Sequence, residues 1–223
     1  SIESAGTVQW NATACNGDDT CITVCPYDST PKARYTEVAD LLAKIRSAAP
    51  FLSGITVCGG EATQQTEFVQ SLFLAIRADP DLRLLTCFVD SNGAAEAETW
   101  ERLARTMDGA MVDLKCLDPE IHRAMTGQPN DMVLASIRQL HELGLLYEVR
   151  LLLLAGINDD PALLQRTAAW LAEIDPAMRV KLIGFRSHGA RPHDPPLIEP
   201  SPESLRTAAE LLFEFAQFDL CVI

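Results

Sequence analysis

Three cysteines lie close together near the start of the chain, at Cys15, Cys21 and Cys25. The other four stand apart from one another in apolar surroundings: Cys58, Cys87, Cys116 and Cys221. Seven is an odd number, and the first residues do not have the layout of a signal peptide, so a disulfide framework is not expected. We predict that the four separate cysteines are small buried hydrophobic residues. The clustered three are predicted to bind a metal.

The spacing of the clustered cysteines favours iron. The segment from Cys15 to Pro26 has the frame C-x2-C-x2-C-x3-C-P of an iron–sulfur cluster, but Asp18 takes the place of the second cysteine. A carboxylate binds iron more weakly than a thiolate does, which indicates a labile iron or a three-iron cluster. Cys25 would then serve a second cluster, as the fourth cysteine of such a run does in two-cluster ferredoxins. The spacing leaves open a zinc site or a loop without metal.

From residue 36 onward, helix-like segments alternate with short apolar runs typical of strands. We predict strands at residues 54–58, 84–90, 110–113, 148–154, 180–185 and 219–223. Thr66 is the expected N-cap of one helix, Gly144 the expected end of another, and Ser201 with Pro202 the start of the last. The spacing is that of βα units with right-handed crossovers. The continuous apolar strands predict a parallel sheet covered on both faces.

Polar residues follow four of the predicted strands, at 59–61, 90–93, 113–115 and 186–188. In parallel α/β barrels, active sites are built at this rim. Because the polar strand ends need a common centre, we predict an α/β fold of the partial (β/α)6, TIM-like barrel type rather than a doubly wound sheet. The sequence has no G-x-G-x-x-G or Walker loop that would indicate a nucleotide-binding fold of another kind.

The overall composition is that of an ordinary globular protein. The 223 residues are 48% hydrophobic and 22% charged, enough for one large domain with or without a small appendage. The net charge of −13 argues against a nucleic-acid partner. No apolar run reaches the roughly 18–20 residues that a bilayer span needs. We therefore predict a cytoplasmic protein that binds neither nucleic acid nor membrane.

Three longer motifs resemble those of a known family: GITVCGGEAT at 54–63, CFVDSNG at 87–93 and DGAMVDLK at 108–115. Together with Trp10-Asn11, they resemble the activating enzymes of glycyl radical enzymes, within the radical S-adenosylmethionine (SAM) superfamily, and most closely the branch called YjjW. The resemblance implies a partial ferredoxin-like iron–sulfur segment over residues 1–33 and a partial radical SAM barrel, without its first strand, over residues 34–223.

The implied activity is that of an anaerobic oxidoreductase. It uses SAM and reduced [4Fe–4S] clusters to generate a glycyl radical on a partner enzyme, with flavodoxin or ferredoxin as the electron donor. The resemblance implies that Gly59 and Gly60 let the backbone approach the methionine amino group of SAM and that Glu61 accepts a hydrogen bond from it. Lys115 would neutralise the carboxylate of SAM. Arg150, in an apolar strand, needs an anionic partner, either a carboxylate or the cofactor.

The resemblance also implies a monovalent cation next to the cofactor. Asp90 and Ser91 would bind the cation, and Asp113 would be a further ligand or a partner of the SAM ribose. The family has a histidine after its sixth strand. Arg186 stands at that position here and His188 lies two residues on, so both are candidates for cofactor binding.

One element of the family is missing from the sequence. Radical SAM chemistry requires a C-x3-C-x2-C loop that holds the reactive cluster, and these 223 residues do not contain it. The chain also starts at Ser1 rather than at a methionine. The resemblance therefore implies a fragment of an activating enzyme that is inactive by itself. The alternatives are a non-catalytic relative that binds SAM or a protein partner, and an electron-transfer protein built around the cysteine segment, against which Asp18 counts.

Overall fold

One parallel β-sheet organises the part of the chain that the structure describes. The structure is a computed structural model that describes residues 35–188, 193 and 195–223. Residues Val38–Ile223 form one compact unit. Its six strands are β1 (Gly54–Val57), β2 (Thr86–Ser91), β3 (Gly109–Leu114), β4 (Leu146–Leu153), β5 (Arg179–Gly184) and β6 (Asp219–Val222). All six predicted strands are confirmed, and their ends differ from the prediction by a few residues.

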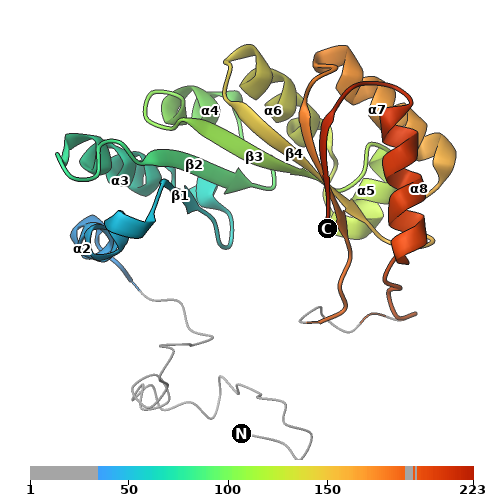
Figure 1. Cartoon of the computed structure of the whole chain (residues 1–223), viewed down its shortest axis with the longest axis horizontal. Helices are drawn as coiled ribbons and strands as arrows, with labels where there is room; N and C mark the ends of the chain where they lie inside the picture. The colour runs from blue at the N-terminus through green and yellow to red at the C-terminus, as the bar shows by residue number, and fades with distance from the viewer. Residues whose placement is uncertain (1–34, 189–192, 194) are drawn as a thin grey trace, which may run out of the picture. The chain divides into compact units, whose positions relative to one another are not determined.

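The strands pair in the order in which they occur in the chain, β1-β2-β3-β4-β5-β6, and every pair is parallel. A doubly wound sheet would reverse its order partway, so this topology confirms the prediction of a barrel-like sheet. Figure 1 shows the strands side by side, with α4, α6 and α7 on the same side of the sheet. Right-handed crossovers between consecutive neighbours explain this placement of the helices.

Seven helices and two short 3-10 helices are described between and around the strands. They are α2 (Val38–Ala48), η1 (Ala49–Phe51), η2 (Ala62–Gln65), α3 (Thr66–Ala78), α4 (Ala97–Leu103), α5 (Pro119–Thr126), α6 (Asp131–Glu142), α7 (Pro161–Ile174) and α8 (Pro202–Phe213). The predicted start of α8 is confirmed, because the side chain of Ser201 accepts a hydrogen bond from the N–H of Ser204 and Pro202 follows. Gly144 ends α6 with a φ of +67°, as predicted.

The expected N-cap role of Thr66 is wrong. Thr66 is the first residue of α3, and its hydroxyl donates to the carbonyl oxygen of Thr63. The chain enters this helix through the short η2 helix, so the capping position moves to Glu61, whose side chain accepts from the N–H of Thr63. Capping by an acidic side chain is favourable because the N–H groups at a helix start lack partners within the helix.

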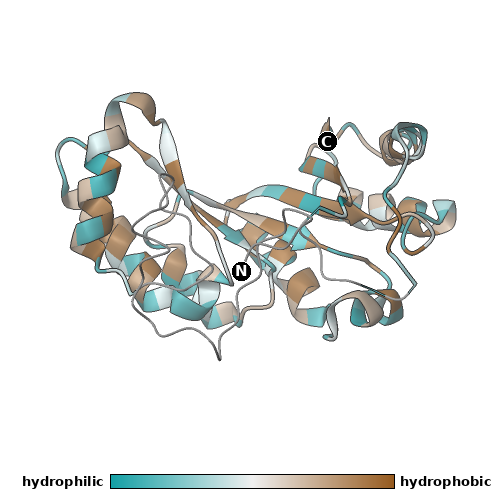
Figure 2. Cartoon of the chain, turned by 90° about the horizontal axis from the view of Figure 1, so that it is seen from below, coloured by the Kyte–Doolittle hydropathy of each residue, from teal (hydrophilic) through white to brown (hydrophobic). Residues whose placement is uncertain are grey.

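The two faces of the sheet differ in burial. Along β2, Cys87 and Val89 are fully buried and belong to the main core, whereas Phe88 and Asp90 between them are only partly buried. β5 has the same alternation, and apolar and polar residues alternate along the strands in Figure 2. Among the described residues, the prediction of a sheet covered on both faces therefore holds for the helix side alone. On the other face, which we call the inner face, Asp90, Asp113 and Arg150 keep partial exposure, whereas Glu148 is buried.

The four separate cysteines differ from one another in exposure. Cys87 and Cys116 are buried as predicted, Cys221 is half-buried and Cys58 is exposed. Burial raises the pKa of the Cys87 thiol to about 11. Cys58 differs from the prediction because it follows the last residue of β1 and starts the turn that leaves the sheet.

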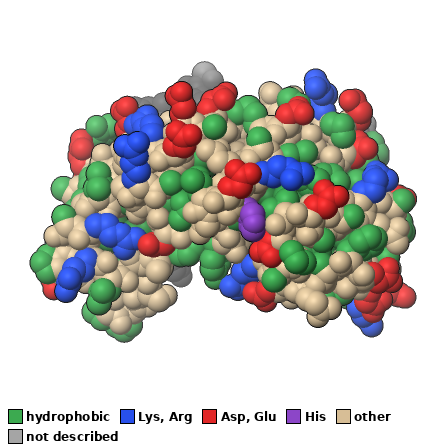
Figure 3. All heavy atoms as spheres, turned by 90° about the horizontal axis from the view of Figure 1, so that it is seen from above, with side chains coloured by type: hydrophobic (Ala, Val, Ile, Leu, Met, Phe, Trp, Pro, Cys, Tyr) green, Lys and Arg blue, Asp and Glu red, His purple; other side chains and the backbone are tan. Residues whose placement is uncertain are grey.

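The surface carries both signs of charge. On the face shown in Figure 3, acidic and basic side chains are interspersed. Neither sign of charge forms a continuous patch of described residues on this face.

None of the helices in the described part of the chain is long and apolar enough to span a membrane.

Candidate functional site

The turn after β1 carries the acidic residue at the centre of the candidate site. Glu61 Oε1 accepts hydrogen bonds from the N–H of Thr63 at 3.1 Å, from the Thr63 hydroxyl at 2.7 Å and from the Ser91 hydroxyl at 2.8 Å. Glu61 Oε2 accepts one bond, from the N–H of Asn92 at 2.8 Å. The carboxylate thus joins the ends of the neighbouring strands β1 and β2. Because a carboxylate has about four acceptor positions, Oε2 has room for another donor.

The two glycines before Glu61 leave the backbone open. Gly59 and Gly60 have φ values of +95° and +54°, a region that other residues rarely adopt. A Cβ added at either position would meet no atom within 4 Å. Glycine is therefore required for backbone conformation rather than for packing against the described residues. The exposed peptide groups are available to a ligand.

The turn after β2 is anchored from the helix side. The Trp100 Nε1–H of α4 donates to Ser136 Oγ of α6 at 2.7 Å, and Ser136 Oγ donates to the carbonyl of Gly93 at 2.7 Å. Gly93 has a φ of +76°, and a Cβ there would lie 2.8 Å from a methyl carbon of Val112. The turn that carries Ser91 and Asn92 is thus held in one conformation by two helices and by the next strand.

Arg150 forms ion pairs with two carboxylates on the inner face of the sheet. Its Nη1 donates to Asp90 Oδ2 at 2.7 Å and its Nε donates to Glu148 Oε1 at 2.9 Å. Its Nη2 lies 2.8 Å from the sulfur of Met111. The expectation that Arg150 needs an anionic partner is met within the protein itself. Asp90, predicted as a cation ligand, lies beside this guanidinium.

Glu148 is a charged residue of the site that the sequence analysis did not identify. Burial acts to raise the pKa of its carboxyl, but hydrogen bonds from Arg150 and Lys181 outweigh that effect, so the pKa lies below its usual value. Glu148 and Arg150 are two residues apart on β4 and therefore share one face. That spacing is the signal from which the pair could have been predicted.

Lys115 and Asp113 form their own ion pair at the end of β3, with Lys115 Nζ 2.7 Å from Asp113 Oδ2. Asn158, also absent from the predicted set, fixes the backbone around them. Its Nδ2 donates to the carbonyl of Lys115 at 2.8 Å and to that of Leu152 at 2.6 Å, while its Oδ1 accepts from the N–H of Leu154 at 2.8 Å. This buried amide therefore ties the end of β3 to the end of β4.

The polar residues after β5 lie in a separate hydrogen-bonded group. Arg186 Nη1 is 3.5 Å from Glu199 Oε2, and Glu199 Oε1 accepts from the N–H and the hydroxyl of Ser187. These contacts hold the pKa of Glu199 below its usual value. His188 is exposed. Among the described residues, neither Arg186 nor His188 forms a hydrogen bond or ion pair with Glu61, Lys115 or Arg150.

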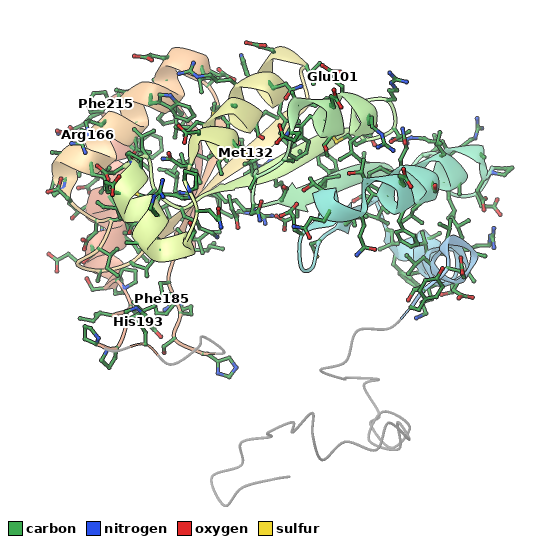
Figure 4. The ribbon with its side chains drawn as sticks, turned by 180° about the vertical axis from the view of Figure 1, so that it is seen from behind. Glu101, Met132, Arg166, Phe185, His193 and Phe215 are labelled. Atoms are coloured by element: carbon green, nitrogen blue, oxygen red, sulfur yellow. The ribbon has the colours of Figure 1, made fainter. Side chains whose placement is uncertain are left out.

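An apolar cavity of about 520 Å³ opens between the ends of β3, β4 and β5. It is lined by Lys115, Ala124, Met125, Thr126, Leu152, Leu154, Ile157, Phe185, His193 and Leu197. Figure 4 shows Phe185 and His193 close together where the chain leaves β5. The cavity places apolar surface beside the Lys115–Asp113 pair, an arrangement typical of small-molecule sites.

Some of the predicted metal ligands lie among the described residues and others lie outside them. Within the described ranges, no group of three or more His, Cys, Asp or Glu side chains is arranged to hold a metal ion. Asp90 is paired with Arg150, and the Ser91 oxygen donates to Glu61 and accepts from the N–H of Gly93. The predicted iron ligands, Cys15, Asp18, Cys21 and Cys25, lie outside the described residues, so the iron–sulfur interpretation and the boundary at residues 33 and 34 stay predictions.

Comparison with known proteins identifies the family. The family model described as the radical SAM superfamily matches residues 14–165, which is more than half of the chain and includes β1, β2, β3 and β4. The chain belongs to the radical SAM superfamily. This match confirms the predicted superfamily, and the sequential parallel sheet agrees with the predicted radical SAM barrel class.

Curated relatives of this radical SAM chain are activating enzymes. It is 30% identical over 138 residues to the pyruvate formate-lyase-activating enzyme of Streptococcus mutans, covering 61% of this chain and 52% of the relative. It is 26% identical over 188 residues to the trans-4-hydroxy-L-proline dehydratase activating enzyme of Clostridioides difficile, covering 69% and 61%. The predicted resemblance to glycyl-radical-enzyme activating enzymes is confirmed. The chain spans a little over half the length of these relatives.

Solved structures support the fold. A domain of a pyruvate-formate lyase-activating enzyme from Bacteroides vulgatus superimposes with a TM-score of 0.61 at 24% identity, over 75% of this chain and 98% of that one. Streptococcus suis SuiB bound to S-adenosylmethionine superimposes with a TM-score of 0.69 at 14% identity, over 87% and 45%. At these identities the likeness concerns the fold.

Proposed function

We propose that this radical SAM chain binds S-adenosylmethionine at the rim formed by the ends of β1 to β4, and that it does so as part of a glycyl-radical-enzyme activating enzyme. The observation that carries the proposal is the turn at Gly59, Gly60 and Glu61. It presents open peptide groups and a carboxylate with spare acceptor capacity at the carboxyl end of a parallel strand.

The residues at the rim fit the methionine part of the cofactor. Its ammonium group would donate to Glu61 Oε2 and to the peptide groups around Gly59 and Gly60. Its carboxylate would bind Lys115. The ammonium of Lys115 already forms an ion pair with one carboxylate, that of Asp113, at 2.7 Å. Asn158 keeps the Lys115 backbone in place for this contact. Arg150, Arg186 and His188 are further candidates for contact with the cofactor.

The cofactor supplies the chemistry that protein side chains lack. Bound at this rim beside a reduced [4Fe–4S] cluster, S-adenosylmethionine would supply one-electron chemistry that abstracts a hydrogen atom, with methionine and 5′-deoxyadenosine as the products. The partner that gives up this hydrogen is a glycyl radical enzyme, and the electron comes from a donor such as flavodoxin or ferredoxin. We place this reaction in an anaerobic cytoplasm. Within the activating enzymes, we assign the chain to the YjjW-like branch.

This chain contains the residues proposed to bind the cofactor but not the cysteine triplet that radical formation requires. The 223 residues contain no C-x3-C-x2-C spacing, so the chain supplies the binding rim, and radical formation needs a protein that contains that triplet. Cys15, Asp18, Cys21 and Cys25 would hold a further, incomplete iron–sulfur cluster. The second candidate function is a relative that binds S-adenosylmethionine or a protein partner without catalysis. The same absence of the triplet favours it.

A monovalent cation would need a rearrangement of the rim. Asp90 is paired with Arg150 and Asp113 with Lys115, and the Ser91 oxygen accepts from the N–H of Gly93. Cation binding is proposed to require that Asp90 share its carboxylate with Arg150. Isothermal titration of S-adenosylmethionine in potassium and in tetramethylammonium buffers tests this, since tighter binding in potassium supports the site and equal binding argues against it.

Titration of the complete 223-residue chain with S-adenosylmethionine tests the proposed function. We expect saturable binding, with ATP as a control that does not compete. Absence of binding refutes the assignment of the rim. Anaerobic reconstitution with iron and sulfide, followed by reduction with dithionite, then separates the two candidates. We expect this chain to form no 5′-deoxyadenosine. If the chain is part of an activating enzyme, a protein that also includes the cysteine triplet should form it.

A further inference from the structure

A buried carboxylate lies behind the candidate site, on the inner face of the sheet. The Glu148 side chain is only 2% exposed, yet it carries a charge among three cations. Its Oε1 lies 2.9 Å from Arg150 Nε and 3.2 Å from Lys181 Nζ, and its Oε2 lies 3.4 Å from Arg179 Nε. Burial of an unpaired carboxylate is strongly unfavourable, so these contacts are what permits a glutamate at this position.

The contact between Glu148 and Arg150 balances charge and also sets the orientation of the Arg150 guanidinium. Glu148 binds the Nε of the guanidinium, while Asp90 on β2 binds Nη1 at 2.7 Å. The guanidinium is planar, so two acceptors on different nitrogens determine both its position and the direction in which its plane faces. Without Glu148, the flexible side chain would be held by Asp90 and by the weak acceptor Met111 alone.

The fixed guanidinium retains donors for a ligand. Arginine has five N–H groups, and the two carboxylates occupy one on Nε and one on Nη1. The Met111 sulfur takes one N–H of Nη2, so one N–H on each Nη remains for a ligand. The Arg150 side chain is 21% exposed, so a ligand at the inner face can reach it.

We propose that Glu148 is a positioning residue, which acts through Arg150 to orient its free N–H groups toward the S-adenosylmethionine site. This inference rests on the proposed function, in which Arg150 contacts the cofactor. Glu148 itself does not touch the cofactor. Its contribution is to pre-organise Arg150, so that binding does not have to order a long side chain.

Three variants of the complete chain distinguish the effect of the position of the Glu148 carboxylate from the effect of its charge. Glu148→Gln removes the negative charge and leaves one acceptor for three cations. Glu148→Asp keeps the charge but withdraws the carboxylate by one methylene. Asp219→Asn is the matched control, because Asp219 lies 3.8 Å from Arg179 in the same charged group and does not contact Arg150. Circular dichroism and thermal unfolding identify the temperature range in which all three are folded.

The first readout is the NMR signal of the Arg150 Nε–Hε group, assigned by its loss in Arg150→Lys. We expect a downfield, slowly exchanging signal in the wild type and in Asp219→Asn, and its collapse toward the solvent-exposed position in both Glu148 variants. An unchanged signal in Glu148→Gln and Glu148→Asp overturns the proposal. This readout needs no cofactor, and it decides whether Glu148 holds Arg150 even if the chain does not bind S-adenosylmethionine.

The second readout is the affinity for S-adenosylmethionine by calorimetry. We expect both Glu148 variants to raise Kd about tenfold, the Asp219→Asn control to keep it, and no further loss when Glu148→Gln is added to Arg150→Ala. Wild-type affinity in Glu148→Asp means that charge alone matters and overturns the positioning role. An equal loss in the Arg150→Ala background overturns it too. Absence of binding by the wild type refutes the proposed function instead.

Discussion

Replacement of Glu61 separates a structural role from a binding role of the same side chain. Glu61→Ala removes the acceptor of the hydrogen bonds from Thr63, Ser91 and the Asn92 backbone. An N-cap contributes about 0.5–2 kcal/mol and a hydrogen bond to a charged group about 1.5–3 kcal/mol, but water replaces some of these bonds because Glu61 is only half-buried. We therefore expect a loss of about 2–4 kcal/mol in the free energy of unfolding.

Glu61→Gln is the more informative change. Its amide oxygen can still accept from Thr63 and Ser91 in place of Oε1, whereas its NH2 group would face the N–H of Asn92 in place of Oε2. Most of the capping interaction is retained, so the expected loss of stability is about 1 kcal/mol. The ammonium of S-adenosylmethionine loses a charged acceptor, which corresponds to a rise in Kd of about 10- to 100-fold.

Urea unfolding and calorimetric titration of the two variants give the two quantities independently. Ser201→Ala is the control for stability, since it removes the N-cap of α8 and is expected to cost about 1 kcal/mol without any change in affinity. If Glu61→Gln binds S-adenosylmethionine as tightly as the wild type does, Glu61 is a helix cap and no more, and the assignment of the ammonium to Oε2 is incorrect.

Three other predictions concern the neighbouring residues. Asn158→Ala should weaken S-adenosylmethionine binding several-fold by calorimetry, because it frees the Lys115 backbone; an affinity equal to that of the wild type argues against this support. Burial lowers the pKa of His122 below the 6.5 of an unfolded chain, so its neutral ring stabilises the fold above pH 6.5 and that stability is lost as the pH falls through the folded-state pKa. Urea unfolding between about pH 7.5 and pH 5 should show a smaller acid loss in His122→Gln, and an identical loss would contradict this. Mass spectrometry after brief iodoacetamide treatment should find Cys58 labelled and Cys87 protected, with S-adenosylmethionine slowing the reaction at Cys58; labelling of Cys87 first would show that the assigned burial is wrong.

The strands could be predicted from sequence because each is a short apolar run between turn residues. The eight-residue helix α5 was missed because it spans only about two turns, too few for a periodic pattern to be recognised. Its real signal is local, since Asp118 caps the helix and Pro119 is its first residue. Thr66 was misplaced for a related reason, because a short 3-10 helix does not produce a periodicity of its own.

The candidate site was predicted as a set of residues but not as a set of contacts. Glu61 and Ser91 were both identified, yet their hydrogen bond depends on the register between β1 and β2, which residue types alone do not determine. Glu148 was missed because one acidic residue in an apolar run resembles a solvent-facing position. Its burial follows from Lys181 and Arg179 on the next strand, which are more than 30 residues away in the sequence.

The sequential order of the strands has a consequence for how the sheet forms. Each strand pairs with the one made just before it, as Ile55 of β1 pairs with Cys87 of β2, so no strand has to be inserted between two that are already joined. Paired strands are therefore closer in sequence than they would be in a sheet with a non-sequential strand order. Shorter intervening segments lower the entropy lost when two strands come together. The sheet can grow by one unit at a time in the order of synthesis. Its cooperativity then resembles that of a short repeat array, with edge strands that open before the centre does.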